Sequence, residues 1–218
     1  MKRTFTFILI VAALFAACSS GKKNLPEDFD FGTVENNVYK NAFFNFEITI
    51  PNGWHVQSQE EAKQLMQIGV DAIAGENRSL RRTLKASEVN SANLLTSFKY
   101  DVDAPVSFNP SIIIMGENLN NFPGIKTGKD YWFHTRNLLL QSGMYSEIDE
   151  NGEWIKLSGQ DFYVANAYIE FPLFSMKQTL YSAIVNHFAI AVIISHKYGD
   201  KESETELMNS IKSLTFSN

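Results

Sequence analysis

Hydrophobic and polar residues alternate along much of this chain with a period of two, the spacing of β-strands. Phe44, Phe46, Ile48 and Ile50 are separated by polar residues, which predicts a strand with one buried face. The same reasoning predicts further strands at 94–100, 111–116, 145–150, 153–157, 161–171, 176–185 and 188–195. The last is nearly all apolar and is expected in the centre of a sheet. Asn151-Gly152 predicts a hairpin between its flanking strands.

Between these strands, apolar residues recur at helical spacing behind recognisable N-terminal capping residues. Ser58 with Glu61 predicts a helix that runs to about residue 74, and a break at 75–77 leads to a second helix over 78–88. Thr127 with Asp130 predicts a helix to about residue 141, and Ser203 with Glu206 predicts a last helix. The predicted fold class is α+β: a mostly antiparallel sheet packed by helices.

Several local motifs occur in the order found in one known superfamily. They are Phe43–Trp54 with its Pro51-Asn52-Gly53 turn, Ser111–Ile114, the helix around Tyr131, Leu157–Phe162, Gln178–Tyr181 and Ser213–Phe216. In these motifs the domain resembles the PsbP-like superfamily, which includes a photosystem II extrinsic subunit, a Ran-binding nuclear import factor and DcrB-type bacterial lipoproteins. The resemblance implies the fold, together with a binding or assembly role without a shared active site.

The N-terminus has the pattern of a bacterial lipoprotein precursor. Lys2 and Arg3 precede an apolar run that ends in Ala16-Ala17-Cys18, and this run is shorter than the roughly 20 residues of a spanning helix. We therefore predict a signal peptide at 1–17, lipidation of Cys18 after cleavage, a flexible tether over 18–36 and one domain over 37–218. This places the domain outside the cytoplasm, anchored to a membrane by its lipid. Ser19 favours the outer membrane if the host is Gram-negative.

Composition narrows the classes of partner. The formal net charge is −5, which argues against nucleic acid as a partner. Cys18 is the single cysteine, so the mature chain has neither a disulfide framework nor a cysteine-based metal site.

Chemical motifs are sparse. The sequence contains no Gly-x-Ser-x-Gly elbow and no phosphate-binding glycine loop, and nothing in it indicates a cofactor or a metal. The four histidines, His55, His134, His187 and His196, lack the spacing of metal ligands, and a structural role is the favoured interpretation. Glu147–Gly152 imitates half of an EF-hand loop but lacks its final glutamate, so the hairpin is favoured there. Asp101 and Asp103 are interpreted as part of a polar loop.

One basic stripe stands out in this acidic domain. Arg78, Arg81, Arg82 and Lys85 recur at three-, four- and seven-residue intervals and would share one face of the second helix. They could bind an anionic group or an acidic patch on a partner. A solvated face, balanced by Glu76 and Glu88, is the simpler alternative.

Three functions fit these observations. The favoured hypothesis is a non-catalytic, membrane-anchored binding or assembly module with a protein partner in the cell envelope. The alternative is a carrier of a small ligand, such as a lipid or a sugar derivative, in an apolar cleft. An enzyme, for instance a hydrolase, has only generic serine, histidine and aspartate residues in its favour.

Overall fold

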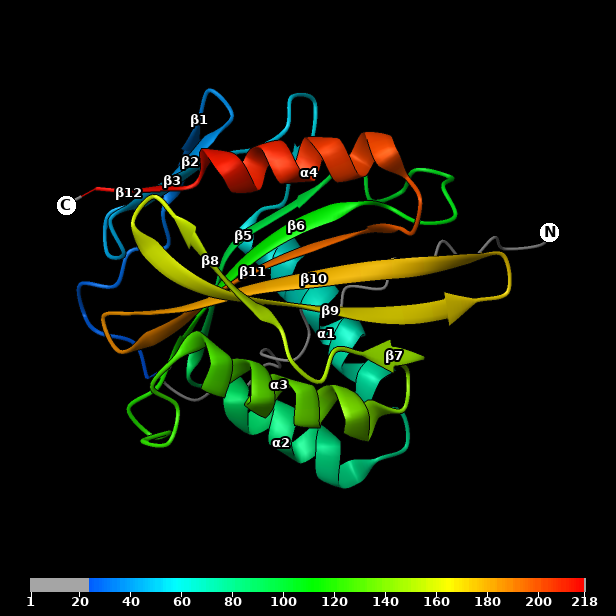
Figure 1. Cartoon of the computed structure of the whole chain (residues 1–218), viewed down its shortest axis with the longest axis horizontal. Helices are drawn as coiled ribbons and strands as arrows, with labels where there is room; N and C mark the ends of the chain where they lie inside the picture. Colours follow the sequence, from blue (N-terminus) through cyan, green and yellow to red (C-terminus); the bar gives the residue numbers. More distant parts are fainter. Residues whose placement is uncertain (1–23, 218) are drawn as a thin grey trace.

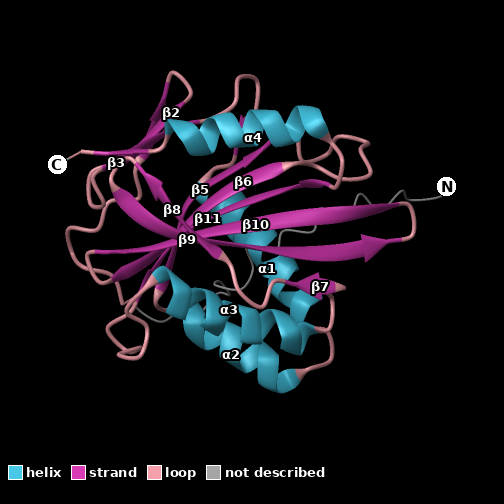
Figure 2. Ribbon diagram, viewed as in Figure 1, coloured by secondary structure: helices cyan, strands magenta, loops and turns pink. Residues whose placement is uncertain are grey.

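The computed structural model describes residues 24–217. Cys18 and the predicted signal peptide lie outside the described residues. Within the described part, the chain forms two antiparallel sheets and four helices, which confirms the predicted α+β class (Figures 1 and 2). No helix in this part of the chain is long and apolar enough to cross a membrane.

The larger sheet forms the middle layer of the domain. In spatial order its strands are β4 (His55–Val56), β5 (Ser91–Phe98), β6 (Ser111–Asn118), β11 (Phe188–Lys197), β10 (Phe174–Val185), β9 (Gln160–Phe171) and β7 (Glu147–Ile148), with β8 (Glu153–Leu157) also paired to β9. β11 lies between β6 and β10 and is buried from Phe188 to His196, which confirms its predicted central position.

Three helices cover one face of this sheet. They are α1 (Gln59–Ala74), α2 (Arg78–Glu88) and α3 (Gly128–Ser142); in Figure 1, α2 and α3 lie below the sheet and α1 passes behind its strands. The predicted capping boxes are present at Ser58–Glu61 and Thr127–Asp130, because each hydroxyl accepts from a backbone N–H and each carboxylate accepts in return. Leu80, Leu84 and Trp132 are almost fully buried in the core between these helices and the sheet.

The opposite face carries α4 (Lys201–Ser213) and a smaller sheet, which lie above the large sheet in Figure 1. The strands of the small sheet are β1 (Thr33–Glu35), β2 (Val38–Asn41), β3 (Phe46–Thr49) and β12 (Thr215–Phe216). Leu207, Ile211 and Leu214 are buried in a second core on this side, as their helical spacing predicts. The large sheet therefore separates two hydrophobic cores.

The predicted hairpin at Asn151-Gly152 is wrong. β7 and β8 do not pair with each other, because both pair with β9, β7 at residues 167–168 and β8 at 160–164. The tight turn lies one step later in the chain, at Ser158 and Gly159, whose φ angles of 46° and 87° supply the two left-handed residues of a hairpin turn.

The last helix also begins earlier than predicted. Its N-cap is Asp200, whose carboxylate accepts from the backbone N–H of Ser203 at 3.1 Å, so Ser203 lies inside the first turn. Lys99 stabilises that turn from outside the helix, because its ammonium group pairs with Glu202 and Glu206 at 2.8 Å each.

The packed domain also starts earlier than residue 37. Asn24 donates from its side chain to Asn90 at 3.1 Å and accepts through its carbonyl from Asn118 at 2.8 Å. Phe29 and Phe31 pack against the second core, and β1 follows them. Folded structure thus extends back to at least Asn24, into the segment assigned by sequence to the tether.

Candidate functional site

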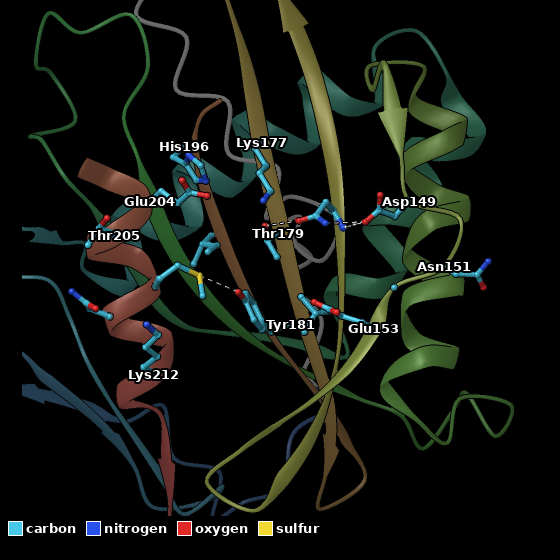
Figure 3. A pocket seen from close by; sticks show the side chains of 16 residues that line it. Asp149, Asn151, Glu153, Lys177, Thr179, Tyr181, His196, Glu204, Thr205 and Lys212 are labelled. Carbon is cyan, nitrogen blue, oxygen red and sulfur yellow. Dashed lines mark hydrogen bonds between the residues drawn. The ribbon is translucent and has the colours of Figure 1, made fainter. Parts of the chain in front are cut away.

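An open groove of about 680 Å³ crosses the α4 side of the large sheet (Figure 3). Its floor is made by side chains of β9, β10 and β11, one wall by α4, and the other wall by the 149–153 segment that joins β7 to β8. In Figure 3, Lys177, Thr179 and Tyr181 follow one another along β10 between these two walls.

Several long-range contacts hold the α4 wall in place. The Ser210 hydroxyl donates to the carbonyl of Thr49 at 2.6 Å, and the Thr49 N–H donates to the Ser213 hydroxyl at 2.8 Å. At the other end of the helix, Lys99 is only 11% exposed. Burial alone would lower the pKa of Lys99, but its hydrogen bonds to Glu202 and Glu206 outweigh this and raise that pKa. The wall is therefore fixed at both ends.

A chain of hydrogen bonds ties the opposite wall to the floor. The Thr179 hydroxyl donates to Asn166 Oδ1 at 2.8 Å, and Asn166 Nδ2 donates to Asp149 Oδ2 at 2.9 Å. The Asn166 backbone N–H donates to the same Asp149 oxygen at 2.8 Å, and Asp149 returns a backbone bond to Asn166 O at 2.9 Å. Side chains from β10, β9 and the 149–153 segment are thus linked to one another across the groove.

The ionisable groups of the groove have contrasting environments. His196 and Glu204 contribute from β11 and α4. Burial lowers the pKa of His196, so this ring is mostly uncharged at neutral pH. The hydrogen bond from Lys201 lowers the pKa of Glu204, which stays ionised. Burial raises the pKa of Tyr181 to about 12, and its hydroxyl lies 3.4 Å from the sulfur of Met208.

The predicted basic stripe lies elsewhere, on α2 beneath the opposite face of the sheet. Arg78, Arg82 and Lys85 are exposed to solvent. Arg81 is turned back toward α1, where it pairs with Asp71 and donates to the carbonyl of Gly75 at 2.8 Å. The four residues share one helix face as predicted, but Arg81 is engaged in the corner between α1 and α2, and none of the four lines the groove.

The four histidines are scattered. His196 lines the groove, whereas His187 lines a hollow beside Phe122 and His55 lines one beside Asp101. His134 lies on α3 with its ring centre 5.7 Å from that of Phe122, and burial lowers its pKa. Within residues 24–217, no three His, Cys, Asp or Glu side chains are placed to hold a metal ion.

Sequence reasoning missed the groove itself. Its floor residues are polar positions within otherwise apolar strands, such as Asn166 in β9 and Thr179 in β10. These polar residues within apolar strands were the signal in the sequence from which the groove could have been predicted. Grouping them into one surface requires the strand register, which pairs Asn166 with Thr179 and Lys177 with His196.

No protein-family model and no curated protein matches this sequence. Among solved structures, a crystal structure from Bacteroides thetaiotaomicron VPI-5482 is similar at 12% identity and a TM-score of 0.40, covering 85% of this chain. This chain spans 50% of that one. LpqN, involved in cell envelope biogenesis of Mycobacterium tuberculosis, is similar at 10% identity and a TM-score of 0.39, covering 79% of this chain and 83% of its own.

Proposed function

We propose that this protein is a lipid-anchored, non-catalytic binding module of the bacterial cell envelope, and that the groove over β9, β10 and β11 is its binding site. The observation that carries the proposal is the groove's construction: an open, polar-lined concavity whose two walls are fixed by hydrogen bonds and ion pairs. Such pre-formed concave sites with convergent polar groups are where ligands bind in folded domains.

The contacts within the groove support binding rather than chemistry. Glu204 is held by Lys201, and Asp149 is held by Asn166. His196 Nδ1 lies 2.8 Å from the backbone carbonyl of the next residue, Lys197. These contacts hold the three side chains in place at the groove, as a recognition surface needs. The same polar lining favours a ligand that forms hydrogen bonds and disfavours a lipid chain. A lipid carrier would enclose the chain in an apolar chamber.

Photo-crosslinking in intact cells tests the binding site. Asn209 is exposed and lines the groove, so p-benzoylphenylalanine at this position should capture the ligand as a defined adduct. The matched control places the same group at Thr83, exposed on α2. Adducts at position 209 and not at position 83 support the proposal. Equal capture at both positions, or none at 209, contradicts it.

The anchor is tested separately, at Cys18. Cys18→Ser should abolish palmitate labelling and release the protein from the membrane fraction, while the circular dichroism spectrum of the domain stays the same. Persistent labelling of this variant would show that the lipoprotein assignment is wrong.

A further inference from the structure

Two tyrosines lie together at one end of the large sheet, where β11 ends. Tyr198 follows β11 and is 68% exposed, although its backbone N–H is fixed to Ser175 O at 2.8 Å. Tyr168 on β9 is partly exposed, and the two ring centres are 6.1 Å apart with an interplanar angle of 70°. An exposed tyrosine ring that packs against a second ring presents an apolar face to solvent.

The strand register places this tyrosine pair beside the groove. Tyr168 is opposite Lys177, and Lys177 is opposite His196, so these three side chains form one row on the same face of the sheet. Tyr198 is two residues beyond His196, and the next row inward pairs Asn166 with Thr179. The aromatic surface is therefore continuous with the polar floor.

The charges of the groove nearly cancel. Asp149, Glu153 and Glu204 contribute negative charge, and Lys177 and Lys212 contribute positive charge. Glu204 is also neutralised locally by Lys201 at 2.8 Å. Positively and negatively charged side chains alternate in the described lining, and no cluster of basic residues dominates it. This pattern suits an uncharged ligand that both donates and accepts hydrogen bonds, and it does not suit a phosphate or a polyanion.

The backbone of the floor is already used. β10 is paired with β9 and β11, β11 is paired with β6, and β9 is paired on its far side with β7 and β8. An extended peptide that binds a sheet gains affinity chiefly from the free backbone groups of an edge strand, and this floor provides none along its paired length. A ligand in the groove must be recognised by side chains.

From these observations, and resting on the proposed function of the groove, we infer that its ligand is a neutral oligosaccharide. A sugar ring has an apolar C–H face and a rim of hydroxyl groups that donate and accept. One ring would stack on Tyr198 beside Tyr168, and the hydroxyl groups of the next would bond to Lys177, Asn166 and Asp149. The tyrosine pair lies beside the polar residues of the groove, so two neighbouring sugar rings could contact the tyrosines and the polar residues in turn.

The test uses the full chain in detergent micelles and an immobilised panel of short linear β-1,4-glucan, α-1,4-glucan, β-1,4-mannan and chitin fragments. We expect binding to at least one member and a loss of about tenfold in affinity for Tyr198→Ala, with Tyr198→Phe keeping the wild-type affinity because stacking needs only the ring. Tyr100→Ala removes another exposed tyrosine, 40% exposed, that is neither in the groove lining nor in the row formed by Tyr168, Lys177 and His196, and it should bind as the wild type does.

The outcomes separate this inference from the function it rests on. No binding to any panel member, or equal binding by wild type and Tyr198→Ala, overturns the oligosaccharide. If mass spectrometry shows that the mass added at position 209 consists of amino-acid residues, the groove binds a polypeptide, so the ligand class is wrong while the binding module stands. If position 209 captures nothing more than position 83 does, both fail.

Discussion

A buried carboxyl group provides the sharpest quantitative prediction. Glu117 lies on β6, on the side of the large sheet covered by helices, and is 2% exposed. One of its oxygens accepts from the Tyr131 hydroxyl at 3.0 Å, and the other is buried without a hydrogen-bond partner among residues 24–217. Burial raises its pKa from 4.5 to about 7, and the bond from Tyr131 offsets only part of that rise.

The sign of the stability effect follows from proton binding. Between pH 4.5 and pH 7 the folded state keeps the Glu117 proton while the unfolded state releases it, so raising the pH favours unfolding. The difference between a pKa of 4.5 and one of about 7 is worth about 3 kcal/mol at 1.36 kcal/mol per unit. Of this, about 2.5 kcal/mol is lost between pH 5 and pH 8.5.

Glu117→Gln removes this titration and keeps a carbonyl oxygen for Tyr131. Urea unfolding at a series of pH values should show the variant gaining stability relative to the wild type as the pH rises, by about 2.5 kcal/mol from pH 5 to pH 8.5. Glu60→Gln, at an exposed position of α1, is the control and should show no such trend. A stability difference between Glu117→Gln and wild type that stays constant with pH would refute the reasoning.

Three further predictions concern local structure. Thr127→Ala removes the hydroxyl that caps α3 and should lower the free energy of unfolding by about 1 kcal/mol in urea; an unchanged midpoint would show that the cap adds no stability. Arg81→Met should cost up to about 1 kcal/mol through its lost contacts with Asp71 and Gly75, whereas Arg82→Met should be neutral, and equal thermal shifts would contradict this. Gly152→Ala places a methyl group against the carbonyl of Val164 and should cost about 1 to 3 kcal/mol, unlike Asn151→Ala at the exposed neighbouring position; equal stability of these two variants would disprove the close approach.

Elements specified by neighbouring residues were predictable. The capping boxes at Ser58 and Thr127 and the range of α2 are as the sequence indicates, because each depends on side chains within one helical turn. The start of α4 was not predictable in this way, although Ser203 and Glu206 have the three-residue spacing of a capping box. Asp200 caps that helix and Lys99 orders its first turn, and the contribution of Lys99 comes from about 100 residues away in the chain.

The error at Asn151-Gly152 has a similar origin. A dipeptide that favours a turn does not determine which strand its flanks pair with, and β9 is long enough for β7 and β8 to pair with it in succession. Gly152 is needed there for a different reason, since a β-carbon would overlap the carbonyl of Val164. The groove wall thus depends on a backbone approach that becomes apparent only once the register of β9 is known.

The same limit explains why the basic stripe on α2 was more visible in the sequence than the groove. Arg78, Arg82 and Lys85 are close in the chain, so helical spacing alone groups them. The groove combines three strands, a loop segment and the last helix, and its polar residues come from segments 149–212 that meet only after the sheet has formed. The two surfaces lie on opposite sides of the large sheet, so a ligand in the groove leaves the exposed face of α2 uncovered. Replacing the stripe should therefore leave oligosaccharide binding unchanged, and a change would mean that the two faces are coupled through the sheet.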